Sequence, residues 1–256
     1  VAVAGNIGPS LLDKLTQCLV DNQLPDIWVL ELSSYQLFYS HDFNPDAATV
    51  LNITEDHLDW HGDFNHYCVA KKKIFGPSTI PILNRDDLKV MSMLDLDARD
   101  RMRTISFGID TPQEQDQFGI VGDMNGGIDW LAWIMPDEES GQRKRRRAKE
   151  VAHEYEQPVQ IKRLIPTEAL LIKGRHNATN TLAALGLGQA IDLSMASLLH
   201  GLRDYRGEPH RVQSIGVIED VEYIDDSKGT NVGATLAALT GLGSSIAEKK
   251  IILIAG

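Results

Sequence analysis

The sequence predicts an α/β fold built on a mostly parallel sheet, followed by the beginning of a second, smaller α/β unit. Short apolar runs suited to buried strands alternate with stretches of helical periodicity along most of the chain. Polar turns, several containing glycine, follow these runs, as they do in strand–turn–helix units. With 256 residues, 43% of them hydrophobic, the chain can bury the core of one large or two ordinary domains.

The expected strands are continuous apolar runs, which are typical of a parallel sheet covered on both faces. We expect the runs at Ile27–Leu32 and Ala47–Ile53 to be parallel neighbours or near neighbours, because a polar cluster follows each of them. A β-hairpin is expected over Gly119–Ile134, around the Asn-Gly-Gly turn that begins at Asn125. The remaining expected strands are Val1–Ala4, Ile80–Leu83, Thr104–Phe107, Ala169–Ile172, Val221–Ile224 and Ile251–Ala255.

The first expected helix begins after Ser10, a typical N-cap residue, and carries Leu11, Leu12, Leu15 and Leu19 on one face. Further helices are expected at Asn177–Ile191, Ser194–Leu202 and Val232–Leu242. Together with Val221–Ile224 and Ile251–Ala255, the last of these forms a strand–loop–helix–strand pattern. That pattern predicts the opening of a Rossmann-type domain.

Two segments interrupt the regular pattern. Residues 111–166 have a different character and contain the basic run 143–149, which we interpret as a solvated loop of an inserted segment. A nucleic-acid or targeting role is the alternative for this run. The polar residues 206–209 contain Gly and Pro and are a candidate domain boundary.

Charge and composition exclude several classes of protein. The formal net charge of −11 argues against nucleic acid or an anionic membrane as a partner, because both are themselves negative. Cys18 and Cys68 form no disulfide framework, so we expect a cytoplasmic protein. No apolar run approaches the ~18 residues of a membrane span, and no signal-peptide pattern is present.

Three polar clusters in the first third of the chain are candidates for chemistry. Glu31 ends an apolar run, so its carboxylate is either paired or capping, or holds a metal ion such as Mg²⁺. The segment 52–61 combines three acidic residues with two histidines, which suits a cation site but also a helix N-terminus. The lysines at 71–73 lie on an amphipathic helix, where consecutive lysines are usually solvated.

Two further clusters lie later in the chain. Segment 174–180 opens a helix with a histidine and two asparagines, which can bind a nucleotide or simply cap the helix. Segment 225–231 is a polar, glycine-containing turn between a strand and a helix, so its free N–H groups and Lys228 suit a phosphate or a carboxylate.

The order of these clusters resembles a known family. The segments AGNIG, LELSSYQL, LNITEDHLD, YCVAKKKIF, KGRHNATN, GEPHR and DDSKGTN match, in this order, motifs of the Mur ligase family. The resemblance implies a UDP-substrate domain, a central ATPase domain with a mostly parallel sheet, and a Rossmann-like C-terminal domain. On this basis residues 1–205 are expected to be the central domain, with an insertion at about 111–166, and residues 209–256 the start of the C-terminal domain.

The resemblance also implies roles for single residues. Glu31, His57 and a carbamylated Lys71 are expected to hold two Mg²⁺ ions, and Lys228 joins them as a catalytic residue. The residues expected to bind ATP are His176, Asn177, Asn180, Arg211 and Asp226. Those expected on the substrate side are Asn6, Ser33 and Thr230. On a helix, only Lys71 of the three lysines is expected to face the site, with Lys72 and Lys73 toward solvent.

AGNIG and LELSSYQL are most similar to the branch of the family that adds D-glutamate to UDP-N-acetylmuramoyl-L-alanine, through an acyl phosphate, in peptidoglycan synthesis. The resemblance implies ATP, a monomer, and no nucleic-acid or membrane partner. A Mur-type ligase for another amino acid and a non-catalytic fragment are the alternatives. The family's glycine-rich phosphate loop is expected before Val1, and its Gly-Lys-Ser/Thr pattern does not occur in the sequence. We therefore expect the 256 residues not to turn over alone.

Overall fold

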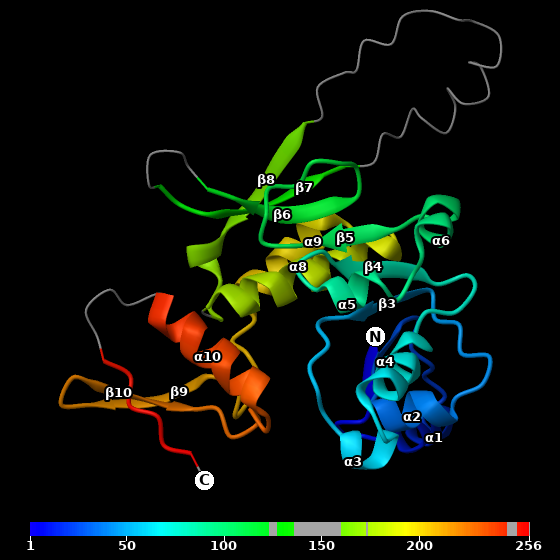
Figure 1. Ribbon diagram of the computed structural model, residues 1–256, viewed down its shortest axis with the longest axis horizontal. Helices are drawn as coiled ribbons and strands as arrows, with labels where there is room; N and C mark the ends of the chain where they lie inside the picture. Colours follow the sequence, from blue (N-terminus) through cyan, green and yellow to red (C-terminus); the bar gives the residue numbers. More distant parts are fainter. Residues whose placement is uncertain (123–126, 136–159, 173, 245–249, 256) are drawn as a thin grey trace, which may run out of the picture. The chain divides into compact units, whose positions relative to one another are not determined.

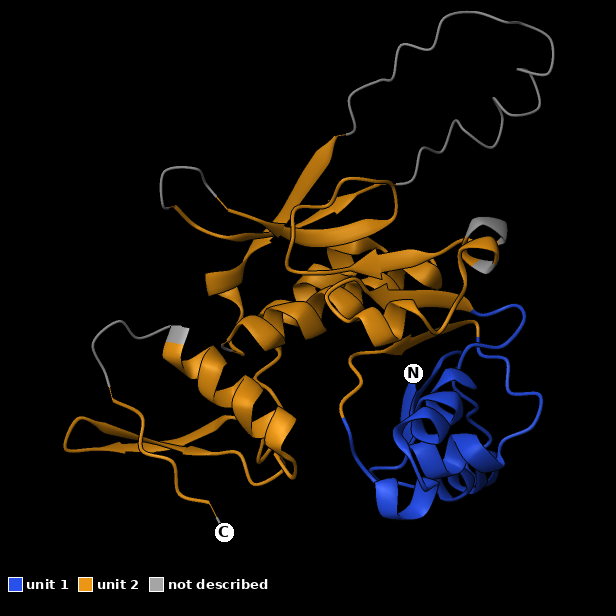
Figure 2. Ribbon diagram, in the orientation of Figure 1, with its two compact units in different colours: residues 1–45, 55–79 blue, residues 46–54, 80–256 orange. Residues whose placement is uncertain are grey.

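The computed structural model describes residues 1–122, 127–135, 160–172, 174–244 and 250–255 (Figure 1). They form two compact units, each of which is described by itself (Figure 2). Unit 1 comprises residues 1–45 and 55–79, and unit 2 comprises residues 46–54 and 80–256.

Unit 1 is a two-stranded parallel sheet with four helices. Strands were expected at both of the apolar runs that form β1 (Ala2–Gly5) and β2 (Trp28–Glu31), and the two strands pair in parallel. A Cβ at Gly5 would collide with the backbone carbonyl of Glu31. Only glycine therefore fits at the end of β1, beside the backbone of Glu31. The helices are α1 (Leu11–Val20), α2 (Ser34–Tyr39), α3 (Leu58–His61) and α4 (Phe64–Lys72).

Local sequence explains where three of these helices begin. The side chains of Ser10, Ser33 and Asp63 each accept a hydrogen bond from a backbone N–H in the first turn of α1, α2 and α4 respectively. The cap predicted at Ser10 is therefore confirmed. The leucine face of α1 is not buried, since Leu12 is 74% exposed and Leu19 is 59% exposed.

Unit 2 is built on a six-stranded sheet in the order β3-β4-β5-β6-β7-β8. The first four strands are parallel and the last two pairings are antiparallel. The strands are β3 (Ala47–Val50), β4 (Ile80–Asn84), β5 (Ile105–Phe107), β6 (Gln117–Val121), β7 (Trp130–Ile134) and β8 (Ile161–Pro166). The predicted α/β fold with a mostly parallel sheet is thus confirmed, as is the antiparallel pair β6–β7. The start of the turn between them lies outside the described residues.

Helix α8 (Arg175–Ala190) packs against the parallel part of this sheet, and α9 (Met195–Asp204) contacts α8 and packs against the same core (Figure 1). Leu182 and Leu185 of α8 meet Ile82, Ile105 and Phe107 of the strands in the main core, all fully or almost fully buried. Short helices α5 (Leu88–Met91) and α6 (Leu96–Arg101) follow β4. Burial of the large side chains of the main core is the main stabilising contribution in unit 2, at about 1.5–3 kcal/mol for each side chain.

The C-terminal part of unit 2 has an antiparallel pair, β9 (Gln213–Ile218) and β10 (Val221–Asp225), followed by α10 (Val232–Ser244). Strand β9 was not expected from the sequence. The strand expected at Ile251–Ala255 is wrong, because these residues pair with no strand in the described part of the chain. Their side chains are exposed, Ile254 to 93%, so the apolar run alone could not show whether a partner strand is present.

Two other expectations are corrected. The runs at β2 and β3 belong to different sheets, since β2 pairs with β1 and β3 pairs with β4. An apolar run predicts a buried strand but does not specify its partner. Ala169–Ile172 is not a strand either: a 3-10 turn, η2 (Thr167–Ala169), places Leu170 in the core.

The segment 111–166 is in part integral to the sheet. Its strands β6, β7 and β8 extend the parallel strands, and Phe118, Leu131, Trp133 and Ile165 belong to the main core. The connection between β7 and β8 includes the basic run 143–149, which lies outside the described residues.

Within the described residues, no helix combines the length and the apolar character needed to cross a membrane. Neither Cys18 nor Cys68 forms a disulfide, and Cys18 is buried on α1.

Candidate functional site

Glu31 and its neighbours form one edge of the candidate site in unit 1. Glu31 is exposed at the carboxyl end of β2, and its carbonyl accepts a hydrogen bond from the backbone N–H of Asn6 at 2.7 Å. Ser33 caps α2 in a reciprocal capping box with Gln36, whose backbone N–H lies 3.2 Å from Ser33 Oγ. The structure therefore brings Asn6 beside Glu31 and gives Ser33 a structural task in addition to any contact with substrate.

His57 lies at the start of α3 in the left-handed conformation, with φ +54°. Its backbone N–H donates to Asp56 Oδ1 at 2.9 Å, and its ring lies 4.9 Å from that of Tyr35. A non-glycine residue in this conformation is uncommon and stores strain that the surroundings must balance. The short helix therefore presents an imidazole and the Asp56 carboxylate together, with 3.5 Å between His57 Nδ1 and Asp56 Oδ1.

Lys71 differs from the two lysines that follow it. Lys72 and Lys73 are exposed, as predicted, whereas Lys71 is half-buried with its Nζ 5.9 Å from the centroid of the Tyr67 ring. Burial lowers the pKa of Lys71, while the charges of Glu31 and Asp56 act to raise it. Lys73 instead donates to the carbonyl of Phe38.

Electrostatic interactions between the candidate metal residues and their neighbours show which of them lie near one another. Glu31 and Asp56 both act on Lys71, and Lys71 and His57 both act on the buried His61. Burial, with Asp56 next, raises the pKa of Tyr67 to about 12. The candidate metal residues Glu31, His57 and Lys71 therefore gather in one part of unit 1.

The donor set suits a divalent cation better if Lys71 contributes an anion beside Glu31. Among the described residues no three His, Cys, Asp or Glu side chains are grouped as a preformed metal site. Mg²⁺ commonly uses one or two protein carboxylates and completes its shell with water and phosphate oxygens. A carbamate on Lys71 would add the missing oxygen ligand beside Glu31, so the residues present fit such an ion.

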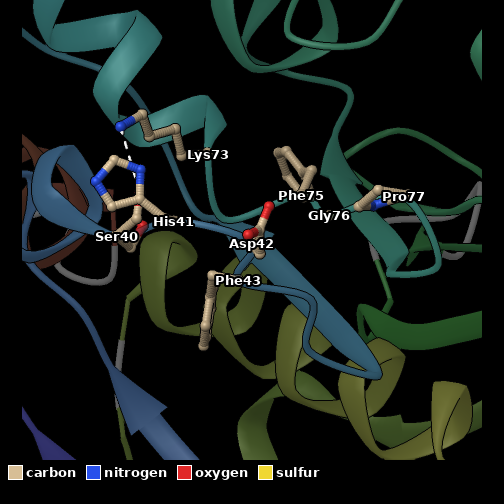
Figure 3. A pocket seen from close by; sticks show the side chains of 8 residues that line it. All are labelled: Ser40, His41, Asp42, Phe43, Lys73, Phe75, Gly76 and Pro77. Carbon is tan, nitrogen blue, oxygen red and sulfur yellow. Dashed lines mark hydrogen bonds between the residues drawn. The ribbon is translucent and has the colours of Figure 1, made fainter.

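A separate open pocket of about 350 Å³ lies in unit 1 between the segments 40–43 and 73–77 (Figure 3). It is lined by Ser40, His41, Asp42, Phe43, Lys73, Phe75, Gly76 and Pro77. Lys73 spans its rim, with Nζ 3.5 Å from the carbonyl of Ser40. None of the residues predicted for the site lines this pocket.

The other predicted residues lie in unit 2. His176 is in the first turn of α8; burial lowers its pKa, while the charge of Asp226 acts to raise it. The structure thus brings His176 and Asp226 together. Asn177 is half-buried and Asn180 is exposed one turn further along the same face of α8.

Two loops carry Arg211, Asp226, Lys228 and Thr230. The backbone N–H of Val212 donates to Asp226 Oδ1 at 3.1 Å, and that of Lys228 donates to the carbonyl of His210 at 3.2 Å. Thr230 donates its N–H to the carbonyl of Lys228 at 3.0 Å. Hydrogen bonds therefore join the loop that precedes β9 to the loop that follows β10. Arg211 lies on the first of these loops and Lys228 on the second.

The sequence reasoning missed some residues of this region. His210 Nδ1 lies 2.7 Å from Asp225 Oδ2, and this hydrogen bond from His210 lowers the pKa of Asp225 to about 2. At the end of β4, burial raises the pKa of Asp86, which lies within the field of Arg175 on α8. The sequence could have indicated Asp86 as a candidate, because the polar run Asn84-Arg85-Asp86-Asp87 follows an apolar run as the other polar clusters do.

Comparison with known proteins identifies the family of this chain. Residues 10–188 match the model of the Mur ligase middle domain. The chain therefore belongs to the Mur ligase family, whose members in general are ATP-dependent ligases that use Mg²⁺. It is 52% identical over its whole length to the UDP-N-acetylmuramoylalanine–D-glutamate ligase of Cupriavidus pinatubonensis, and 54% identical to that of a Polaromonas species.

The chain spans about half the length of these curated relatives, 50% of the first and 42% of the second. Among solved structures, MurF from Acinetobacter baumannii superposes with a TM-score of 0.57 at 17% identity, covering 94% of this chain and 53% of MurF. MurC from Thermotoga maritima superposes with a TM-score of 0.55 at 16% identity, over 94% of this chain and 53% of MurC. At such identities these two likenesses establish the fold alone.

Proposed function

We propose that this chain is part of a ligase that joins D-glutamate to UDP-N-acetylmuramoyl-L-alanine with ATP, in peptidoglycan synthesis in the cytoplasm. The observation that carries the choice of substrate is the identity of 52% along the whole chain to ligases of that name. In this reaction the alanyl carboxylate accepts the γ-phosphoryl group of ATP, ADP leaves, and the amine of D-glutamate then displaces phosphate.

The residues of unit 1 support the metal part of this proposal. Glu31, His57 and Lys71 would hold Mg²⁺, with two ions as the expected number, and the ions would neutralise the phosphate oxygens. Burial of Lys71 favours the neutral amine, which is the form that adds CO₂. The amine nitrogen of Lys71 would form an N–C bond to CO₂ and lose a proton to solvent, which leaves a carbamate anion. This anion could bind a metal ion, whereas the lysine cation could not.

The residues of unit 2 support the nucleotide part. His176, Asn177 and Asn180 would lie near the adenine, and Arg211 and Asp226 near the ribose and phosphates. Lys228 would act on the phosphates, and Lys228 and Thr230 would also face the carboxylates of D-glutamate. Asn6 and Ser33 would contact the other substrate. Phosphoryl transfer needs aligned positive charge more than covalent chemistry from the protein, and these residues match that need.

The domain assignment is part of the proposal. Residues 1–205 would be the central domain and residues 209–256 the beginning of the C-terminal domain, with the protein acting as a monomer without nucleic-acid or membrane partners. The family match over residues 10–188 supports the first of these assignments.

Dependence on the amino acid tests the proposal. Phosphate release by a ligase of the relatives' full length that contains this chain should require D-glutamate and UDP-N-acetylmuramoyl-L-alanine together. L-Alanine, diaminopimelate, lysine and D-alanyl-D-alanine should give only background release. Release that instead depends on one of these four would assign the chain to another Mur-type ligase.

A further inference from the structure

His61 is a buried side chain with no part in the function proposed above. It ends the four-residue helix α3, its residue is 8% exposed, and its Nε2 atom lies 2.9 Å from the hydroxyl of Ser34. Ser34 is itself 2% exposed. This bond satisfies Nε2 of His61, whereas its Nδ1 atom is buried with no hydrogen-bond partner among the described residues. Loss of the bond to Ser34 would leave a further buried polar group unpaired, at a cost of about 1–3 kcal/mol.

The ring of His61 contacts both other helices around the metal residues. On α2 it stacks on Tyr35, with 5.7 Å between centroids, and on α4 it meets Tyr67 edge to face at 5.4 Å. Within its own helix it packs on Trp60 at 4.6 Å. One imidazole is therefore held by α2, α3 and α4 together.

The contacts of His61 with Ser34, with the backbone of His57 and with Tyr67 each lead to one candidate metal residue. Ser34 lies three residues after Glu31, at the start of α2. The backbone N–H of His61 donates to the carbonyl of His57 at 3.0 Å, which closes the single turn of α3. Tyr67 lies one helical turn before Lys71 on α4, with the lysine amine 5.9 Å from its ring.

We infer that His61 is a positioning residue that, through its hydrogen bond to Ser34 and its contact with Tyr67, sets the relative positions of Glu31, His57 and Lys71. This inference rests on the metal site proposed above. Glu31, His57 and Lys71 come from a strand end, a four-residue helix and a longer helix, so little in the local backbone holds them in register. Outer contacts that orient ligands typically change metal affinity by about 10- to 100-fold when removed.

The test measures Mn²⁺ affinity of the 256-residue chain by electron paramagnetic resonance in bicarbonate, with ¹³C-bicarbonate NMR to detect a carbamate on Lys71. His61→Phe keeps a ring of similar shape but removes the hydrogen bond, and Ser34→Ala removes its other half. Both should weaken Mn²⁺ binding at least about tenfold. The double variant should bind no more weakly than the worse single variant, because both act through one bond.

Controls separate positioning from loss of fold. His61→Gln, whose amide reaches the place of Nε2, should recover most of the affinity. His66→Gln, at a histidine whose side chain is 70% exposed on α4, should bind as the unaltered chain does. All variants are compared below their melting temperatures, with helix content checked by circular dichroism.

The outcomes are distinct. If the unaltered chain binds Mn²⁺ while His61→Phe and Ser34→Ala bind it equally well, the positioning role is refuted and the metal site stands. If the unaltered chain binds no Mn²⁺ and shows no carbamate, the proposed metal site fails, and the role of His61 fails with it.

Discussion

The imidazole of His176 on α8 occupies the space directly beside Gly241 on α10. A methyl group at Gly241 would lie 2.6 Å from His176 Nδ1 and 2.9 Å from Cε1. Since Gly241 is buried, this contact joins the beginning of one helix to the end of another that is distant in sequence. The candidate boundary at 206–209 falls between the two residues in the sequence, and both residues belong to unit 2.

Gly241→Ala should therefore lower the stability of the chain and change the environment of the His176 ring. We expect the free energy of unfolding to fall by about 1–3 kcal/mol, as for other overpacked positions, and the ring signals of His176 in NMR to move. Gly243→Ala on the same helix is the matched control, because the nearest atom to its Cβ is 4.0 Å away. Equal effects of the two substitutions would show that helix propensity, rather than the His176 contact, decides the result.

A second pair of glycines tests the core of unit 2. A Cβ at Gly186 on α8 would lie 2.9 Å from the Cγ2 methyl of Ile82 and 3.3 Å from that of Ile105, whereas Gly201 on α9 has no atom within 4 Å. Gly186→Ala should destabilise the chain by about 1–3 kcal/mol, because branched side chains in a packed sheet have little room to move. Gly201→Ala should stabilise it by about 0.5–1 kcal/mol. Urea denaturation of both variants measures the sign of each change in the free energy of unfolding. Stabilisation by Gly186→Ala would contradict the packing of α8 on the sheet.

The pair formed by His210 and Asp225 predicts a dependence on pH. The pKa of Asp225 is lowered from an ordinary 3.8 to about 2, chiefly by the hydrogen bond from His210. A carboxyl group with a depressed pKa contributes stability above its unfolded pKa, and this contribution is lost as the pH falls through its folded pKa. The stabilisation should thus be complete above about pH 4 and disappear toward pH 2.

Carboxyl ¹³C NMR titration measures this directly. In His210→Ala the pKa of Asp225 should rise toward its ordinary value. Asp63, whose pKa is lowered first by the backbone N–H of His66, is the internal control and should keep its titration. An Asp225 titration that is unchanged in His210→Ala would show that the hydrogen bonds from Ser227, rather than the one from His210, lower the pKa of Asp225.

Lys71 should be essential in a ligase of full length that contains this chain. Because loss of an outer contact alone costs about 10- to 100-fold, Lys71→Ala should lower turnover by at least about 100-fold. A small carboxylate supplied in solution should restore part of the activity by taking the place of the carbamate. Lys72→Ala, at the exposed neighbour, should leave turnover unchanged, and full activity of Lys71→Ala would remove this lysine from the site.

Local sequence was sufficient wherever the physical cause is local. The cap at Ser10, the strands β1, β2 and β4, and the helix that begins near Asn177 follow from short-range hydrogen bonding and from hydrophobic periodicity. Helix geometry indicates that only one of the three lysines at 71–73 can easily face the site, and the resemblance to the Mur ligase family selected Lys71 among them.

Pairing, by contrast, depended on the tertiary structure. The separation of β2 from β3 into different sheets, the buried Ser34–His61 bond and the fit of Gly241 against His176 all join residues far apart in the chain. An apolar run shows that a segment seeks burial, and a histidine shows that a group can bond or titrate. Neither specifies its partner, because partner choice minimises the free energy of the whole packed unit and no local pattern records it.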